Sequence, residues 1–177
     1  MRFRLTGPLF AGALLVLAGM GGAGAAEPPA PPEPRLYDAI TMDDLADTLL
    51  LEGLRFSRVP IDGKGMVANE RLDVLDGVDW SALGYDCKPA RGCTELQMRA
   101  VFDAAKTGEA LLRQVNDWNA ANRFTRAYAL NNATAVVEMD IYLSGGQTLK
   151  NIRDQITIWR QSVRRFSTTL RNQKTAP

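Results

Sequence analysis

The sequence contains no histidine, and this absence excludes several of the commonest kinds of enzyme site. Ser-His-Asp triads, Cys-His dyads and histidine-ligated metal centres all require an imidazole. No other constellation of catalytic residues is recognisable, so we expect no catalytic residue, no metal and no cofactor. An excess of one charge is also lacking, because the 21 basic and 20 acidic residues nearly cancel. This balance gives no steering toward nucleic acid or an anionic membrane.

Long hydrophobic runs are absent as well. The apolar stretch at residues 9–17 follows Arg2 and Arg4 and precedes the small residues 23–25. It is shorter than the roughly 20 residues of a membrane-spanning helix, and the three-part pattern is typical of an export signal. We predict cleavage after residue 25 or 26, a periplasmic or secreted bacterial protein, and no stable membrane insertion afterwards. The alternative is an uncleaved N-terminal anchor.

The remaining chain is long enough for one domain with its own core. Removing residues 1–26 leaves 177 − 26 = 151 residues. Five prolines between residues 27 and 34 predict a stiff, extended spacer. The predicted organisation is therefore a signal peptide at 1–26, a proline-rich linker at 27–40, an α+β domain at 41–171 and a flexible tail at 172–177.

Cysteine is scarce, with only Cys87 and Cys93 in the chain. In an exported protein, two cysteines this close together favour a disulfide. Pro89 and Gly92 between them predict a turn joining paired strands. A redox-active pair or two free thiols are the alternatives, although the spacing is wider than the C-x-x-C of redox enzymes.

The first half of the domain reads as one helix followed by hairpins. Thr41 and Asp44 form a capping-box pattern, and an apolar set recurs behind them at Leu45, Leu49, Leu50 and Leu54. Asp-Gly pairs at 62–63 and 76–77 predict hairpin turns between strands at 55–61, 66–75 and 78–86. The clearest strand is 93–103, where apolar and polar residues alternate.

A second helix begins at Thr107 or Gly108 and carries the apolar stripe Leu111, Val115 and Trp118. We expect Asn116 and Asn119 to fix the corner where it meets the next strand. In the hairpin that follows, a two-residue turn at 131–132 predicts one buried side. The expected pairs are Phe124 with Met139, Tyr128 with Ala135 and Arg123 with Asp140.

Gly145 and Gly146 end this hairpin, and a last helix is predicted over 148–170. Its apolar residues repeat at steps of three and four, as in a heptad seam: Leu149, Ile152, Ile156, Trp159, Val163, Phe166 and Leu170. The favoured interpretation is a helix lying along the sheet. The alternative is that the seam or a neighbouring face pairs with a second copy or a partner. The predicted fold is α+β: an antiparallel sheet of hairpins with an N-terminal, a central and a long C-terminal helix packed on it.

Several of these pieces together resemble a known family. They are Asp76-Gly77, Cys87 with Gly92-Cys93, Leu96-Gln97, Phe102-Asp103, residues 115–119, residues 123–128 and Gly145-Gly146. The most specific is the run Asn116, Trp118, Asn119, Arg123, Phe124, Arg126, Ala127 and Tyr128. The chain from about 41 to 170 resembles the YbjN domain family of bacterial sensory-transduction regulators. The resemblance implies a fold similar to type III secretion chaperones and supplies no catalytic residue.

Three functions are compatible with these patterns. The favoured one is a non-catalytic, exported interaction module, chaperone-like or regulatory, with an unidentified protein partner or a second copy of itself. The second is a small-molecule sensor whose pocket is lined by Trp118, Tyr128 and Trp159, although core packing explains these aromatics better. The third is an enzyme using Glu138 and Asp140, which alternate on one strand face; solvated acids neutralised by a nearby arginine are the simpler interpretation.

Overall fold

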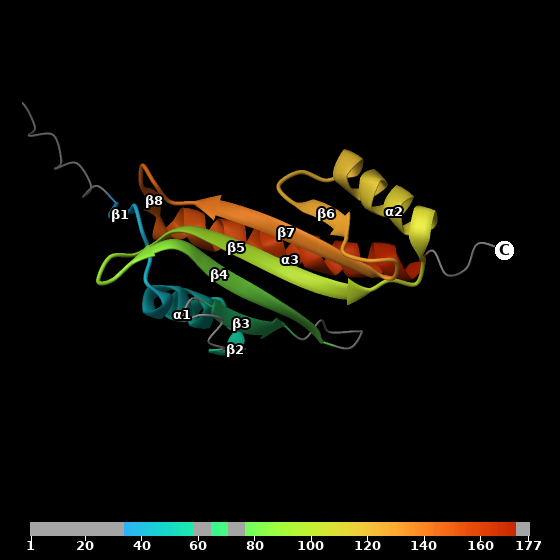
Figure 1. Ribbon diagram of the computed structural model, residues 1–177. Helices are drawn as coiled ribbons and strands as arrows, with labels where there is room; N and C mark the ends of the chain where they lie inside the picture. Colours follow the sequence, from blue (N-terminus) through green and yellow to red (C-terminus); the bar gives the residue numbers. More distant parts are fainter. Residues whose placement is uncertain (1–33, 59–64, 71–76, 173–177) are drawn as a thin grey trace, which may run out of the picture. The chain divides into compact units, whose positions relative to one another are not determined.

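The computed structural model describes residues 34–58, 65–70 and 77–172 (Figure 1). The predicted signal peptide, most of the proline-rich segment, the turn at 62–63 and Asp76 lie outside these residues. In chain order the elements are β1 (Leu36–Tyr37), α1 (Met42–Leu51), β2 (Arg55–Ser57), β3 (Gly65–Glu70), β4 (Val78–Lys88), β5 (Gly92–Asp103), α2 (Gly108–Ala121), β6 (Arg126–Ala129), β7 (Thr134–Tyr142), β8 (Gln147–Thr148) and α3 (Leu149–Asn172).

Six strands form one antiparallel sheet in the order β2-β3-β4-β5-β7-β6. Neighbouring strands are joined by hairpins except where α2 and β6 intervene between β5 and β7. Strands β4, β5 and β7 are the longest, and β5 lies between the other two. The small strands β1 and β8 pair separately. The predicted α+β fold with an antiparallel sheet is confirmed.

All three helices contribute to a core on one face of the sheet. Strand alternation sends Leu96, Met98 and Ala100 of β5 to this face, where each is at most 2% exposed. The apolar sides of the helices pack on the same cluster, and α3 runs along the sheet behind β5 and β7 in Figure 1. The buried seam of α3 is continuous from Ile152 to Leu170. It is therefore used inside the molecule, as the favoured interpretation predicted, and is not available to a second copy.

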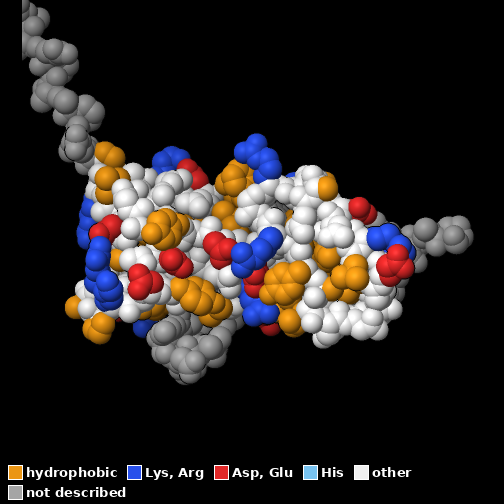
Figure 2. Space-filling model, turned by 45° about the horizontal axis from the view of Figure 1, so that its top comes forward, with side chains coloured by type: hydrophobic (Ala, Val, Ile, Leu, Met, Phe, Trp, Pro, Cys, Tyr) orange, Lys and Arg blue, Asp and Glu red, His pale blue; other side chains and the backbone are white. Residues whose placement is uncertain are grey.

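The opposite side of the sheet carries side chains that no described helix covers, and we call it the open face. It comprises Ser81, Leu83 and Tyr85 of β4, Glu95, Gln97, Arg99 and Val101 of β5, Arg126 and Tyr128 of β6, and Val136, Glu138, Asp140 and Tyr142 of β7. In Figure 2, acidic and basic side chains gather near the middle of the molecular surface, with hydrophobic side chains on either side of them.

The segment before α1 belongs to the folded domain, so the predicted linker boundary at residue 40 is wrong. Ile40 is fully buried, and its backbone exchanges two hydrogen bonds with Cys93, at 2.9 and 2.8 Å. Gly92 permits this contact, because a Cβ there would lie 2.4 Å from the carbonyl carbon of Ile40. The sequence signal was the proline run, which ends at Pro34 and not at residue 40.

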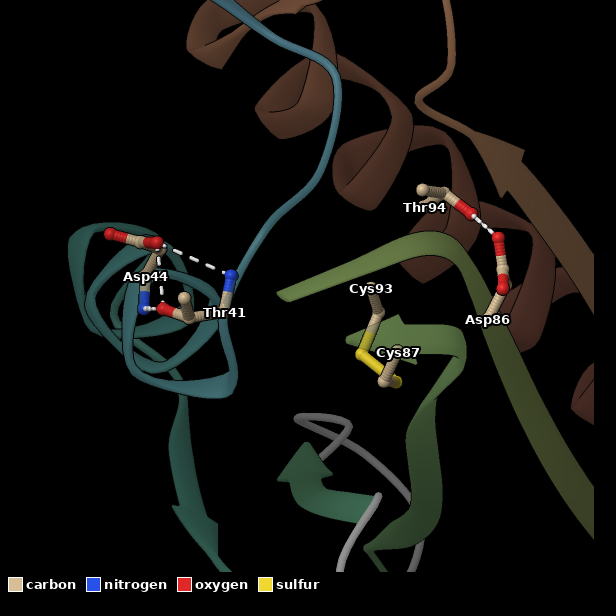
Figure 3. Close-up of a disulfide and its surroundings, with 6 residues drawn as sticks. All are labelled: Thr41, Asp44, Asp86, Cys87, Cys93 and Thr94. Atoms are coloured by element: carbon tan, nitrogen blue, oxygen red, sulfur yellow. Dashed lines mark hydrogen bonds between the residues drawn. A yellow bond between two sulfur atoms is a disulfide. The ribbon is translucent and has the colours of Figure 1, made fainter. Parts of the chain in front are cut away.

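The capping box and the disulfide form as predicted (Figure 3). Asp44 N donates to Thr41 Oγ1 at 3.0 Å, and Thr41 N donates to Asp44 Oδ2 at 3.2 Å. Cys87 and Cys93 are direct cross-strand partners of β4 and β5 and are joined by a disulfide. One detail of α1 differs from the prediction, because Leu50 is 59% exposed and does not join the buried side.

The hairpin of β6 and β7 differs from its predicted register by one residue. Tyr128 pairs with Val136 and Arg126 with Glu138, and residues 131–133 form a three-residue loop. Leu130 N donates to Thr134 O at 2.8 Å across that loop. A shift of one residue exchanges the two faces of a strand. Ala127 consequently points to the core, and Tyr128 lies on the open face.

Phe124, which was predicted to lie on the buried side, precedes β6 and is 60% exposed. Leu130, which follows β6, is 52% exposed. Arg123 does not pair with Asp140; the ion pair to Asp140 comes from Arg126, whose cross-strand partner is Glu138. Small Ala127 suits the inward position, where α2 packs closely over β6.

The stripe of α2 is confirmed, and it generates a test of the packing. Trp118 is 3% exposed, and its ring meets that of Phe166 edge-on at 4.9 Å. We expect Trp118→Ala to lower the free energy of unfolding by about 3–5 kcal/mol, as core truncations do. The matched control Leu112→Ala, on the exposed side of the same helix at 51%, should cost less than about 0.5 kcal/mol. Urea unfolding measures both, and equal losses would contradict the packing.

Candidate functional site

The corner between α2 and β6 is held by the side chain of Asn119. Its amide Nδ2 donates to Ala127 O at 2.9 Å, and its Oδ1 accepts from Ala127 N at 2.7 Å. The side chain thus makes the two hydrogen bonds that a neighbouring strand would make at this position of edge strand β6. An edge blocked in this way is a poor template for strand addition. The predicted role of Asn119 at the corner is confirmed, whereas Asn116 is exposed on the helix.

Two more side-chain hydrogen bonds complete the corner. Trp118 Nε1 donates to Thr125 Oγ1 at 3.2 Å, and Asn122 Nδ2 donates to Trp118 O at 2.9 Å. Trp118 O also accepts from the backbone N of Asn122 at 2.9 Å, so the backbone and the side chain of Asn122 both end the helix on this one carbonyl. Asn122 is therefore a residue of the corner that the motif does not include.

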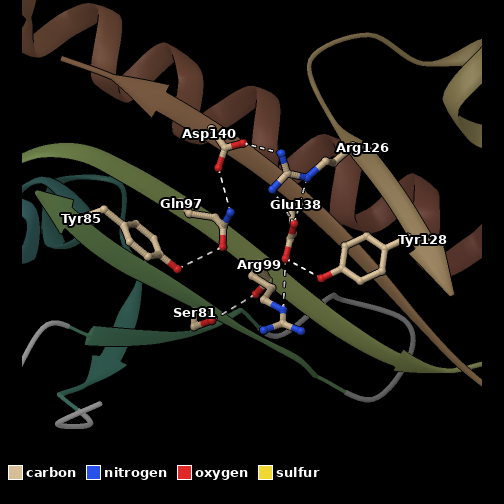
Figure 4. Close-up of polar contacts among 8 residues, drawn as sticks. All are labelled: Ser81, Tyr85, Gln97, Arg99, Arg126, Tyr128, Glu138 and Asp140. Carbon is tan, nitrogen blue, oxygen red and sulfur yellow. Dashed lines mark hydrogen bonds and ion pairs between the residues drawn. The ribbon is translucent and has the colours of Figure 1, made fainter. Parts of the chain in front are cut away.

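Glu138 is the centre of the open face. Although it lies on the side without helices, its side chain is only 6% exposed. Arg126 donates to Oε2 through Nε at 3.0 Å and Nη2 at 2.9 Å, Tyr128 Oη donates to Oε1 at 2.8 Å, and Arg99 Nε lies 3.3 Å from Oε1. Figure 4 shows the three partners converging on the carboxylate.

The network continues along the face through Arg126. Its Nη1 donates to Asp140 at 3.0 Å, and Gln97 Nε2 donates to the other oxygen of Asp140 at 2.9 Å. Tyr85 Oη approaches Gln97 at 3.4 Å, which is a long contact (Figure 4). Side chains of four strands are thereby linked in one layer. The strand register brings these side chains together, although they are far apart in the sequence.

The surroundings of two members of this network raise their pKa values. The hydrogen bond to Glu138 is the main cause that raises the pKa of Arg126 above its ordinary value. The pKa of Tyr128 is also raised, chiefly by desolvation and then by its hydrogen bond to Glu138. Ionising the phenol would remove the donor and place two negative charges together. At neutral pH the site is thus two guanidinium groups and a neutral phenol around one carboxylate.

This arrangement is suited to holding the face in one conformation. Glu138 accepts from several donors at once and is shielded from solvent, so the predicted acid pair of Glu138 and Asp140 has no free carboxylate at its centre. Arg99 was not singled out from the sequence, and Gln97 was named only as part of the family resemblance. Their signal was the alternation of residues 93–103, which places both on the polar side of that strand.

Beside the network lies a groove of about 450 Å³ lined by Tyr85, Glu95, Gln97, Asp140 and Tyr142, among others. Several large hydrophobic side chains of the open face are exposed. Tyr85 is 43% exposed, Val101 50% and Tyr142 62%. Exposed aromatic and aliphatic side chains around a fixed polar centre are typical of surfaces that bind proteins.

The aromatics predicted to line a sensor pocket do not meet. Trp118 and Trp159 are both buried in the core, and Tyr128 lies on the opposite face of the sheet. Trp159 packs edge-on against Trp80 at 5.9 Å. The core-packing interpretation is confirmed for the two tryptophans and is wrong for Tyr128. Gly145 and Gly146 form the turn into β8 with φ of +92° and +95°.

Two general properties bear on what the site can hold. Across residues 34–58, 65–70 and 77–172, no group of three or more Cys, Asp or Glu is placed to bind a metal ion. Within the same residues, no helix is both long and apolar enough to cross a membrane.

Comparisons with known proteins confirm the resemblance found in the motifs. Residues 89–172 match the model of the YbjN family, described as "Putative bacterial sensory transduction regulator". The crystal structure of YbjN from E. coli, described as "a putative transcription regulator", is similar in fold, with a TM-score of 0.51 and 17% identity. The similarity covers 74% of this chain and 89% of that one. No curated protein matches the sequence.

The buried carboxylate gives a second testable prediction. Glu138→Gln removes the negative charge between two arginines, and we expect the free energy of unfolding to fall by about 1–3 kcal/mol, the range for hydrogen bonds to charged groups. The control Asp140→Asn breaks an ion pair whose two side chains are 58% and 54% exposed, so it should cost less than about 0.5 kcal/mol. Urea unfolding of both variants, with Cys87–Cys93 oxidised, is the measurement. A larger loss for Asp140→Asn would contradict the central role of Glu138.

The raised pKa of Tyr128 predicts a pH dependence. Because folding favours the protonated phenol, the stability it contributes is complete below the ordinary pKa of 10.0 and is lost as the pH rises through the higher folded-state value. Between about pH 8 and pH 11, the free energy of unfolding should therefore fall more for the natural protein than for Tyr128→Phe, which has no proton to lose. Parallel curves from urea unfolding would contradict this assignment.

Proposed function

We propose that this protein, whose residues 89–172 match the YbjN family, is a non-catalytic regulatory protein that binds a protein partner through the open face of its sheet. The observation that carries the proposal is the composition of that face. Glu138 and its arginines hold a fixed polar centre, and Tyr85, Val101 and Tyr142 stand exposed around it.

Other surfaces offer less for a partner. The seam of α3 is buried against the sheet, and Asn119 occupies the outward hydrogen-bonding groups of Ala127 on edge strand β6. The other edge strand, β2, is only three residues long. Addition of a strand from the partner, a mode that the chaperone-like fold suggests, is therefore disfavoured relative to side-chain contacts on the open face.

We also propose that the protein acts outside the cytoplasm, in the periplasm or beyond. Two independent features support this location. The N-terminal 26 residues have the three-part pattern of an export signal, and Cys87 and Cys93 are paired across adjacent strands. Structural disulfides persist in oxidising compartments and are rare in the cytosol.

The test is a crosslinked pull-down of the tagged mature protein from its native envelope fraction. The double variant Val101→Ser/Tyr142→Ser removes two exposed hydrophobic side chains from the open face. The matched control Leu50→Ser/Leu112→Ser removes two from helices, where the natural side chains are 59% and 51% exposed. We expect a dominant partner with the natural protein and the control, and at least about tenfold less with the open-face variant.

Two results would contradict the proposal. One is equal recovery of the partner with both double variants, which would place binding elsewhere on the molecule. The other is recovery of the bait alone by every protein, which would shift the function to self-association. Circular dichroism of each variant controls for folding.

A further inference from the structure

A second recess lies between the segment that follows α2 and the outer side of α3, and it shares no residue with the open face. We call it the notch. Its volume is about 390 Å³, and its lining includes Asn122, Arg123, Phe124, Ile158, Ser162 and Arg165. It combines exposed apolar and cationic side chains.

Phe124 is held in the notch at a conformational cost. Its φ is +70°, in the left-handed region where a Cβ crowds the following carbonyl oxygen, so that glycine is the usual residue. The strain is not offset by burial, because the side chain is 60% exposed. Asp86 and Ala90 also have positive φ, but both have small side chains near the disulfide turn. A strained, exposed phenylalanine is the kind of outlier from which a function is inferred.

Two arginines of the notch have no acidic partner. The guanidinium of Arg123 stacks over the Phe124 ring, with Cζ at 4.8 Å from the centroid. Within the described residues, neither Arg123 nor Arg165 forms an ion pair with a carboxylate. The sequence holds no Asp or Glu after Asp154, so α3 supplies no counter-charge along its second half.

The simplest alternative for Arg165 is an interaction with the helix dipole, which favours cations near a C-terminus. Helix α3 ends at Asn172, seven residues and about two turns further on. Because the dipole effect falls off within the last turn, it explains Arg171 but not Arg165. Neither the helix dipole nor a carboxylate among the described residues therefore accounts for Arg165.

We propose that the notch binds an acidic segment of a partner polypeptide. A carboxylate would be held by Arg123 and Arg165, and a neighbouring apolar side chain would pack on Phe124 and Ile158. Stacking uses the flat face of the Arg123 guanidinium and leaves its N–H groups at the edge free for paired hydrogen bonds to a carboxylate. Nucleic acid is disfavoured, since its binding usually draws on many phosphate contacts and a long basic surface.

The test titrates the ¹⁵N-labelled mature protein with a capped peptide whose core is Glu-Phe-Glu, up to millimolar concentration, and follows backbone and Arg side-chain NMR signals. The control peptide has Gln in place of both Glu residues. We expect the signals of residues 121–124 and 158–165 to move with the acidic peptide, and at least about tenfold weaker binding of the Gln peptide.

Four variants separate binding from folding. Phe124→Gly and Arg165→Gln should each weaken binding of the acidic peptide at least about tenfold. Phe124→Ala should weaken binding of the peptide equally. The Tm of the Phe124→Ala variant should lie below that of Phe124→Gly, because only glycine relieves the strain of the positive φ. Arg171→Gln, on the same helix outside the notch, should bind as the natural protein does.

Several results would overturn the proposal. They are unchanged notch signals with the acidic peptide, equal response to the Gln peptide, or full binding by Phe124→Gly. Movement of the notch signals with oligodeoxythymidylate but not with the peptide would assign the notch to nucleic acid instead. The open-face variant Val101→Ser/Tyr142→Ser should bind the peptide normally, so failure of one surface is distinguishable from failure of the other.

Discussion

The structure depends on the burial of one face of α3 against the sheet. Trp159 of this helix meets Trp80 of β4, and Phe166 meets both Phe102 of β5 and Trp118 of α2. Aromatic side chains bury large apolar areas, so these contacts join the sheet, the central helix and the last helix in one core. Because strand side chains alternate, filling one face with this core leaves the other face for polar residues and for the partner of the proposed function.

The core buries apolar side chains, whereas the open face buries a charged group. This group is the carboxylate of Glu138, in the middle of the sheet. Glu138 lies on strand β7 between β5 and β6, and only charged or polar neighbours can compensate its loss of water. Arg99 comes from one neighbouring strand, and Arg126 and Tyr128 come from the other. A buried ionic group of this kind does not necessarily add stability, but its many partners favour a single arrangement of the strands that carry them. The polar centre of the proposed binding surface is rigid for that reason.

Local patterns predicted most of the fold, and non-local ones did not. The steps of three and four in α3, the box at Thr41 and the cysteine pair each act within a few residues, and each is confirmed. The register of the last hairpin depended on whether the loop at Asn131 held two residues or three. That one residue decided which face receives Tyr128, and so hid the network around Glu138, whose hydrogen-bonded pairs are 10 to 43 positions apart along the chain.

The motif that suggested the family divides into two physical groups. Trp118, Asn119, Arg126 and Tyr128 each have a partner that explains them, in the core, at the edge of β6 or on the open face. Phe124 differs, because its backbone is strained and its mostly exposed ring stacks with Arg123, which forms no ion pair within the part of the chain that the structure describes. Folding alone would favour glycine at this position. A residue that costs stability and fills no space in the fold is best explained by what it contacts when a partner is bound.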